Sequence, residues 1–176
     1  MNTARKTFFG LLPALVVAFV ACSGDEYTQD GTFACPDQEL FIANVSPLIE
    51  RRCGTLDCHG TSFRPMRVYG RLGLRHPVET NVSGGAPTTQ AELLANYSAI
   101  CTLDPEPMAE AVKDRGSSAE KLLLVNKARG LEAHKGGIVV AENDPADRCI
   151  LGWIKRLPPE QLKADCDAAL AQLEPK

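Results

Sequence analysis

The sequence predicts a mainly α-helical fold with long ordered loops. Between residues 38 and 52, apolar side chains recur three and four residues apart, which is the spacing of one face of a helix. Polar helix-start signals, paired with glutamate or followed by proline, stand near residues 89, 117 and 144. Residues 60–88 are instead rich in glycine and proline, which is typical of loops.

The first helix is expected over residues 38–52. Its apolar face consists of Leu40, Phe41, Val45, Leu48 and Ile49. Pro47 lies inside this segment and has no N–H for the helical ladder, so we expect a kink or a division into two shorter pieces. The helix leads directly to Cys53. Residues 60–88 follow as loop, with room for a short strand or hairpin near residues 66–69.

Four more helices are expected in the second half of the chain. Residues 88–101 begin with a polar start, and the proline-rich stretch at residues 104–107 ends this helix. A capping-box pattern opens the next helix, residues 117–128. Asp144-Pro145 opens another one, and Pro158-Pro159 separates it from a last helix over residues 159–173.

The first 21 residues have the pattern of an export signal. Arg5 and Lys6 precede an uncharged apolar run that ends at Ala21, followed by Cys22. This junction resembles a bacterial lipobox, which implies cleavage before Cys22 and lipidation of that cysteine. We therefore expect a signal peptide over residues 1–21, a tether over residues 22–37 and a helical domain over residues 38–176. The alternative is a retained N-terminal anchor helix.

Cleavage at this point leaves 155 residues, enough for one domain with a core. It removes two basic residues, so that 17 basic residues face 22 acidic ones. An acidic balance without a basic stripe argues against nucleic acid as a partner. The clustered arginines at positions 64, 67, 71 and 75 are expected to form a solvated face or to contact anions.

Two cysteines and a histidine form the most chemically specific pattern: Cys53, Cys58 and, directly after it, His59. A c-type haem is bound through thioethers from two cysteines, and the histidine after the second cysteine ligates the iron. The usual spacing is C-x-x-C-H, whereas four residues separate the cysteines here. The pattern predicts one covalent haem c, with Cys53 and Cys58 as attachment points and His59 as the proximal ligand.

The order of motifs resembles the class I cytochrome c domain, and in particular cytochrome-like lipoproteins of environmental bacteria. Those proteins begin with a V-x-P-h-h-x-x-x-C helix (h, apolar) and end with H-x-G-G and W-I. The corresponding pieces here start at Val45, His134 and Trp153, so that the resemblance covers about residues 38–157. It implies a cytochrome c-like helical fold, in which the first and last main helices cross and bring Val45 and Ile49 near Trp153.

The resemblance also implies a function. The protein would be a membrane-tethered electron carrier rather than an enzyme, and it would exchange single electrons with a redox protein of the bacterial cell envelope. Its lipid would place it on the periplasmic face or in the outer membrane. No hydrolase, metalloprotease or phosphate-binding motif is present in the sequence.

Several side chains could provide the second axial ligand of the iron. Class I cytochromes carry this ligand on a loop shortly before the last main helix, which favours His134, with Met108 as the runner-up. Gly136 and Gly137 would let the backbone turn close to the ring. Met66 follows His59 too closely to reach the opposite face of the haem easily, and His76 belongs to the same loop as Met66.

With haem on Cys53 and Cys58, four cysteines remain for disulfides. Cys149 and Cys166 lie on consecutive helices joined at two prolines, a geometry that suits a bridge. Cys35 and Cys101 would then pair, although other connectivities are open.

Other interpretations of the motif are open as well. In a haem-free lipoprotein acting as a binding or structural module, Cys53 and Cys58 would form a short disulfide and His59 would lie on the surface. A zinc site would need a fourth ligand beside Cys53, Cys58 and His59. A haem peroxidase would need an open position on the iron.

Overall fold

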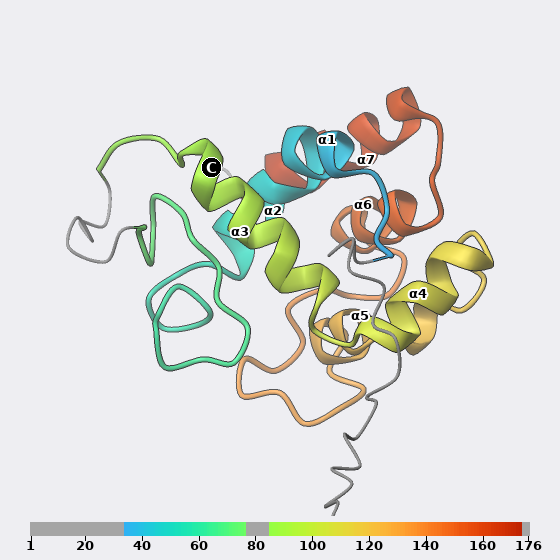
Figure 1. Ribbon diagram of the computed structural model, residues 1–176, viewed down its shortest axis with the longest axis horizontal. Helices are drawn as coiled ribbons and strands as arrows, with labels where there is room; N and C mark the ends of the chain where they lie inside the picture. The colour runs from blue at the N-terminus through green and yellow to red at the C-terminus, as the bar shows by residue number, and fades with distance from the viewer. Residues whose placement is uncertain (1–33, 77–84, 174–176) are drawn as a thin grey trace, which may run out of the picture. The chain divides into compact units, whose positions relative to one another are not determined.

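The computed structural model describes residues 34–76 and 85–173, which belong to one compact unit (Figure 1). The expected signal peptide, the lipidation site Cys22 and most of the tether lie outside the described residues. None of the helices in the described ranges has the length and apolar character needed to cross a bilayer.

The expected mainly α class is confirmed. The helices are α1 (Gln38–Leu40), the π-helical turn η1 (Phe41–Val45), α2 (Ser46–Arg52), α3 (Gln90–Cys101), α4 (Pro105–Lys113), the 3₁₀ turn η3 (Ala119–Lys121), α5 (Leu123–Ala128), α6 (Pro145–Ile154) and α7 (Pro159–Ala171). No strand forms among the described residues. The expected strand or hairpin near residues 66–69 is reduced to a single bridge between Tyr69 and Leu74.

The first helical segment runs from residue 38 to residue 52, and Pro47 changes its pitch without ending it. The turn before Pro47 is π-helical: the N–H of Ser46 donates to the carbonyl of Phe41, five residues earlier. A proline ring inside an α-helix would press on the carbonyl four residues earlier, and the wider π turn relieves that crowding. The segment therefore continues to Cys53, as the apolar pattern predicts.

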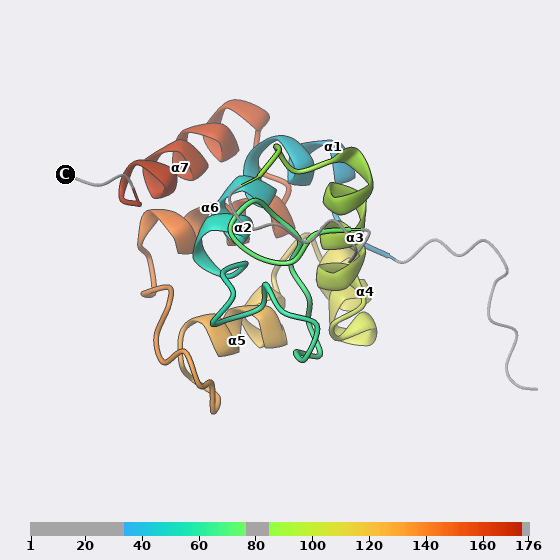
Figure 2. The same cartoon turned by 90° about the vertical axis from the view of Figure 1, so that its left-hand side faces the viewer.

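A pair of helices, α6 and α7, packs against this segment. Asp144 caps α6 by accepting from the N–H of Asp147, and Pro145 lies in its first turn. The predicted disulfide Cys149–Cys166 joins α6 to α7. The two helices lie side by side in Figures 1 and 2.

Aromatic rings join the first helical segment to α6. Phe41 is fully buried, with its ring centroid 5.0 Å from that of Trp153 and 5.6 Å from that of Tyr97 on α3. The Trp153 indole N–H donates to the carbonyl of Asp37 at 2.8 Å. Burial of an indole with its N–H satisfied stabilises this junction. The second predicted disulfide, Cys35–Cys101, ties the chain before α1 to the end of α3.

Two expectations for the middle of the chain were wrong in detail. The prolines after α3 do more than end it, because Pro105 stands in the first turn of a new helix, α4, where its missing N–H costs nothing. The predicted capping box near residue 118 does not form either. Ser118 opens only the short turn η3, and the N–H of Leu123, at the start of α5, donates to Asp104 at 2.8 Å.

Two long loops connect these helices. We call residues 53–76 the motif loop and residues 130–144 the His134 loop. The motif loop lies at the left of the domain in Figure 1, and the His134 loop lies at its bottom in Figures 1 and 2.

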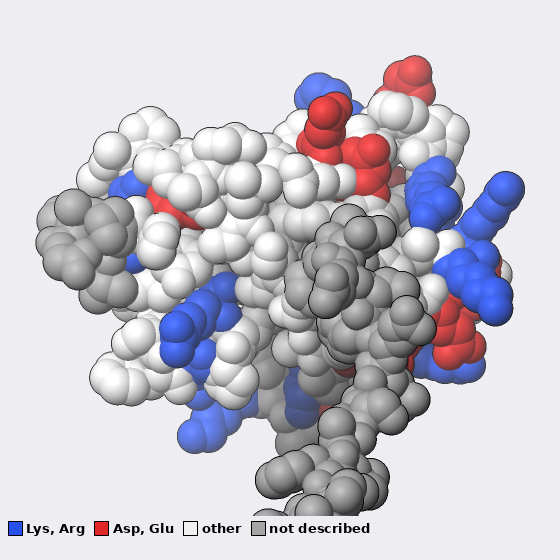
Figure 3. All heavy atoms as spheres, in the orientation of Figure 1, with Lys and Arg blue, Asp and Glu red and all other residues white. Residues whose placement is uncertain are grey.

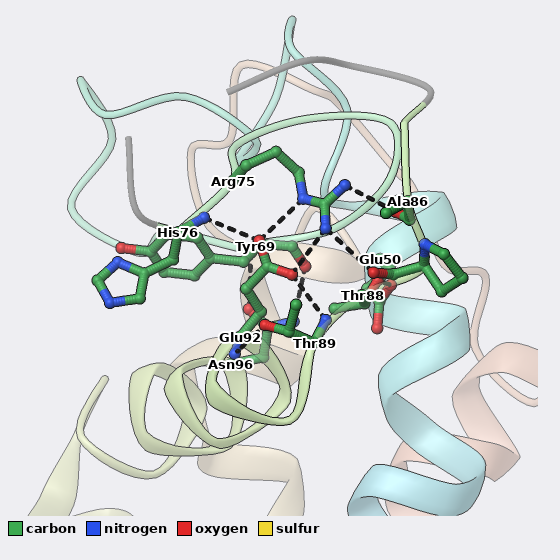
Figure 4. Close-up of polar contacts among 10 residues, drawn as sticks. Glu50, Tyr69, Arg75, His76, Ala86, Thr88, Thr89, Glu92 and Asn96 are labelled. Atoms are coloured by element: carbon green, nitrogen blue, oxygen red, sulfur yellow. Dashed lines mark hydrogen bonds and ion pairs between the residues drawn. The ribbon is translucent and has the colours of Figure 1, made fainter. Parts of the chain in front are cut away.

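The end of the motif loop is fastened to α3 by a buried polar cluster (Figure 4). Arg75 donates from Nε to Glu92 Oε1 at 2.8 Å and from a terminal nitrogen to Oε2 at 3.1 Å. The backbone N–H groups of His76 and Thr89 donate to the same carboxylate at 2.8 and 2.7 Å. The predicted helix start at Thr89 thus becomes a capping box that also holds the loop.

Candidate functional site

The backbone folds tightly around the two cysteines of the motif. Cys53 caps the C-terminus of α2, and the N–H groups of Cys58 and Gly60 both donate to the carbonyl of Thr55. The N–H of His59 returns to the carbonyl of Cys53 at 2.8 Å. The four residues between the cysteines are therefore taken up by a closed turn, and Cys53 and His59 lie directly beside each other in the backbone.

Three glycines let the motif loop close on itself. A Cβ added at Gly60 or at Gly73 would overlap the carbonyl oxygen of Gly54. Backbones approach this closely only where no side chain intervenes. This contact fixes the path of the chain around the cysteines, and glycine is required there by space rather than by backbone conformation.

The His59 ring is oriented by the motif loop itself. Its Nδ1 lies 2.9 Å from the carbonyl oxygen of Met66. A carbonyl oxygen only accepts, so Nδ1 carries the proton and, in the neutral ring, Nε2 carries the lone pair. Histidines that ligate metals are commonly held in this way, through a second hydrogen bond to a carbonyl or a carboxylate. His59 is therefore in the tautomer that ligates through Nε2.

His134 has the same arrangement on the other loop. Its Nδ1 lies 3.1 Å from the carbonyl oxygen of Gly137, which again leaves the lone pair on Nε2. A Cβ at Gly136 would lie 3.0 Å from the ring, so the absence of a side chain there lets the backbone turn beneath the imidazole. Among the described residues, neither Nε2 atom has a hydrogen-bond partner.

The structure brings the two histidines together. Their ring centroids are 6.0 Å apart and their planes differ by 11°. Parallel aromatic rings interact at centroid distances of about 4.5–7 Å, so the two imidazoles form a stacked pair. Two imidazoles that ligate one metal from opposite sides, with each nitrogen about 2.0 Å from the metal, have ring centres roughly 6 Å apart. The ring-centroid distance between these two residues, 75 positions apart in the sequence, is close to that value.

A buried ion pair closes the His134 loop at its base. Arg129, at the end of α5, donates from Nε and a terminal nitrogen to the Asp147 carboxylate at 2.8 and 2.7 Å, and both side chains are buried. Asp147 also accepts from the N–H of Asn143 at 2.9 Å. The side-chain hydrogen bond to Asp147 raises the pKa of Arg129, so the guanidinium stays charged. The two ends of the loop are thereby held together and the position of His134 is set.

The other candidate ligands lie elsewhere. Met108 is fully buried in the hydrophobic core, on α4. The side chain of Met66 is buried in that core as well, and its contribution to the site is its carbonyl group. His76 is exposed, and its ring contacts Tyr69 edge to face with the centroids 5.7 Å apart.

Both motif cysteines are free thiols, whereas the other four cysteines in the described residues form disulfides. Burial raises the pKa of Cys53 to about 12, and the neighbouring Cys58 adds to the effect. Cys53 is therefore a neutral thiol at neutral pH, which does not suit a nucleophile that acts as a thiolate. The Cys53–Cys58 bridge of the haem-free interpretation is not formed in the structure.

No group of three or more His, Cys, Asp or Glu side chains in residues 34–76 and 85–173 could hold a metal ion. A bare zinc ion needs about four protein or water ligands. A haem iron receives four nitrogens from the porphyrin and requires only two axial ligands. A pair of parallel histidines and two free thiols next to one of them therefore match the number of side chains that a covalent haem would need better than the number that a bare metal would need.

Sequence reasoning missed the residues that hold the ligands. Arg129 and Asp147 appear in the sequence as ordinary charged residues, 18 positions apart on different helices. The Met66 carbonyl has no side-chain signature at all. For Arg129 and Asp147, the only signal in the sequence is indirect: a charged residue next to a buried helix end needs a partner of opposite charge.

We compared the chain with family models, curated proteins and solved structures, and none of them matches it.

Proposed function

We propose that this chain is a membrane-tethered c-type cytochrome-like protein that binds one haem covalently and transfers single electrons. The carrying observation is the pair of parallel imidazoles, 6.0 Å apart, with each Nδ1 held by a carbonyl. The resemblance of the motif order to class I cytochromes supports the same conclusion. The bound haem would supply reversible one-electron redox chemistry at its iron.

Each residue of the site has a defined role in this proposal. Cys53 and Cys58 would bind the porphyrin edge through thioethers, so that attachment does not depend on the axial bonds. His59 and His134 would be the axial ligands. The carbonyls of Met66 and Gly137 keep both Nδ1 atoms protonated and fix the direction of each Nε2.

Two histidine ligands also favour a carrier over an enzyme. If His59 and His134 both bound the iron, no position would be left on it for a peroxide or another substrate. A second imidazole favours a lower reduction potential than a methionine thioether would. The expected lipid on Cys22 would keep the domain near redox proteins of the cell envelope.

A haem stain of the denatured full chain tests this proposal. The chain is expressed with its own N-terminal segment in a host that has cytochrome c maturation. We expect haem to remain with the polypeptide, and to be lost in Cys53→Ala/Cys58→Ala. The matched control is Cys149→Ala/Cys166→Ala, which removes the same number of cysteines and should retain haem.

A colourless chain, in a host where a known cytochrome matures, would contradict the proposal. The remaining candidate is then a disulfide-stabilised envelope lipoprotein with a binding or structural role. Thiol titration of the denatured chain would decide that case, because a Cys53–Cys58 bridge leaves neither thiol free to react.

A further inference from the structure

Large apolar side chains are unevenly exposed among the described residues. Six are substantially exposed, and five of these belong to the two loops that carry the histidines. The motif loop contributes Leu56, Phe63 and Leu72, with 52%, 92% and 46% exposure, and the His134 loop contributes Leu131 and Ile138, with 69% and 72%. The sixth, Leu94 on α3, is 37% exposed. Single exposed apolar residues are ordinary, whereas a concentration of them marks an interaction surface.

These side chains belong to the two loops that carry the histidine pair. The motif loop and the His134 loop meet at the stacked rings of His59 and His134, whose centroids are 6.0 Å apart. In Figure 1 the motif loop lies at the lower left of the domain and comes close to the His134 loop at the bottom. A partner that covers apolar side chains from both loops therefore also covers the histidine pair.

The motif loop is rich in basic side chains, with four arginines against one acidic residue, the exposed Asp57, although the chain as a whole carries a formal net charge of −3. Arg67 and Arg71 are exposed, Arg64 is half-buried, and none of the three has a carboxylate partner in the described part of the chain. Lys135 on the other loop is likewise exposed and without an ion pair among the described residues. The acidic residues of the His134 loop are largely engaged, since Glu132 pairs with Lys127 and Glu142 pairs with Arg129.

The space-filling view agrees with this distribution. Lys and Arg side chains without acidic neighbours stand at the lower left of Figure 3, on the side of the motif loop, while the right-hand edge carries both basic and acidic side chains. Interfaces between proteins typically combine an apolar centre with arginines, which bind carboxylates through two parallel hydrogen bonds. Opposite charge on the partner also accelerates encounter.

We propose that this surface, formed by the exposed apolar and basic side chains of the two loops, docks an acidic redox protein over the histidine pair. The inference rests on the proposed function and adds the chemistry of the partner to it. Docking there brings the partner's redox centre next to the proposed haem. The apolar side chains provide the contact area, and the arginines select carboxylate-rich surfaces.

Fluorescence anisotropy of a dye-labelled plant-type ferredoxin, an acidic redox protein, tests the surface. It is titrated with the purified full chain in detergent. We expect the dissociation constant to rise at least tenfold as salt increases from about 0.01 M to about 0.15 M, because the Debye length falls from roughly 30 Å to roughly 8 Å. We expect a further rise of about tenfold, at low salt, in Arg67→Gln/Arg71→Gln and in Phe63→Ser/Ile138→Ser.

Matched controls change the same chemistry outside the two loops. Lys113→Gln/Lys163→Gln removes two positive charges from α4 and α7, and Leu94→Ser removes the exposed apolar side chain of α3. These variants should bind ferredoxin as the unmodified chain does. If the loop variants and the controls bind equally well, or if binding is independent of salt, the proposed surface is wrong.

Cosedimentation with phosphatidylserine-containing vesicles tests whether the surface binds a lipid membrane instead of a protein. Loop variants that lose vesicle binding and retain ferredoxin binding would identify a lipid-facing surface and overturn the proposal. The anisotropy titration detects docking whether or not haem is attached, and a haem stain of the same preparations reports on the proposed function. A failure of the docking proposal can therefore be distinguished from a failure of the cytochrome proposal.

Discussion

Glu92 is a buried carboxylate whose negative charge balances the buried guanidinium of Arg75. Its side chain is fully buried and accepts four hydrogen bonds, two of them from Arg75. Glu92→Gln would leave the buried guanidinium without its counter-charge, and we expect a loss of about 3–5 kcal/mol in the free energy of unfolding. Urea denaturation at neutral pH measures this loss. The control is Glu106→Gln, which removes an exposed first-turn carboxylate from α4 and should cost less than about 1 kcal/mol.

The contribution of Glu92 to the free energy of unfolding should depend on pH. Burial alone would raise the pKa of Glu92, but the hydrogen bonds from Arg75 and from the Thr89 and His76 N–H groups lower it to about 2. A depressed pKa means that the stabilisation is complete above the ordinary value of about 4.3 and is lost as the pH falls toward 2. The difference in unfolding free energy between the unmodified chain and Glu92→Gln should therefore shrink across that window. A constant difference would show that Glu92 acts through packing alone.

Gly60 is required by space in the motif loop. Gly60→Ala would place a Cβ against the backbone carbonyl of Gly54, which cannot rotate away, so we expect about 1–3 kcal/mol of destabilisation. Gly152→Ala is the control, because its Cβ would meet the flexible ends of Leu157 and Leu162, at 3.2 and 3.5 Å, and alanine favours the helix. Thermal or urea denaturation compares the two variants. Equal effects would mean that the glycine contact does not constrain the loop.

At the scale of elements, the Arg129–Asp147 pair determines where the His134 loop lies. Arg129→Met removes a buried guanidinium and leaves Asp147 charged, so we expect a loss of about 3–5 kcal/mol in stability. Hydrogen exchange of the amides in residues 130–144 should accelerate more than that of α6. In the haem-bound chain, the variant should also weaken the ligation by His134, which appears as a change in the absorption spectrum.

Lys163→Met on α7 is the matched control for this variant. Lys163 pairs with Asp167 at 2.6 Å, but its side chain is 64% exposed, and such pairs contribute about 1 kcal/mol or less. If Lys163→Met also lost the ligation by His134, the effect of Arg129→Met would be general destabilisation and not a specific effect on the loop.

The helices also show which features of the fold can be predicted from sequence patterns. The apolar repeat of residues 38–52 predicts the helical segment that leads to Cys53. The apolar face of this segment is buried in the core whether the turns are α-helical or π-helical. The π turn before Pro47 was not predicted in kind, since a kink, a division and a wider turn all relieve the same crowding. The helix α4 was missed because prolines that end one helix can also begin the next.

For the whole molecule, the sequence predicted which cysteines and histidines form the candidate site, but not the groups that hold these side chains in place. Cys53, Cys58, His59 and His134 were all candidates on type and order, and the structure brings His59 and His134 to 6.0 Å from each other. The supports are a carbonyl from Met66, a backbone contact among three glycines and an ion pair across 18 residues. They depend on tertiary packing, which local patterns do not contain.

The most direct test of the central claim is the absorption spectrum of the oxidised full chain, compared between the unmodified protein and His134→Ala. The account predicts a covalently bound, six-coordinate low-spin haem in the unmodified chain and a high-spin spectrum in His134→Ala. His76→Ala should leave the spectrum unchanged. A His134→Ala spectrum identical to that of the unmodified chain would refute the histidine pair, and the absence of any haem band would refute the cytochrome proposal itself.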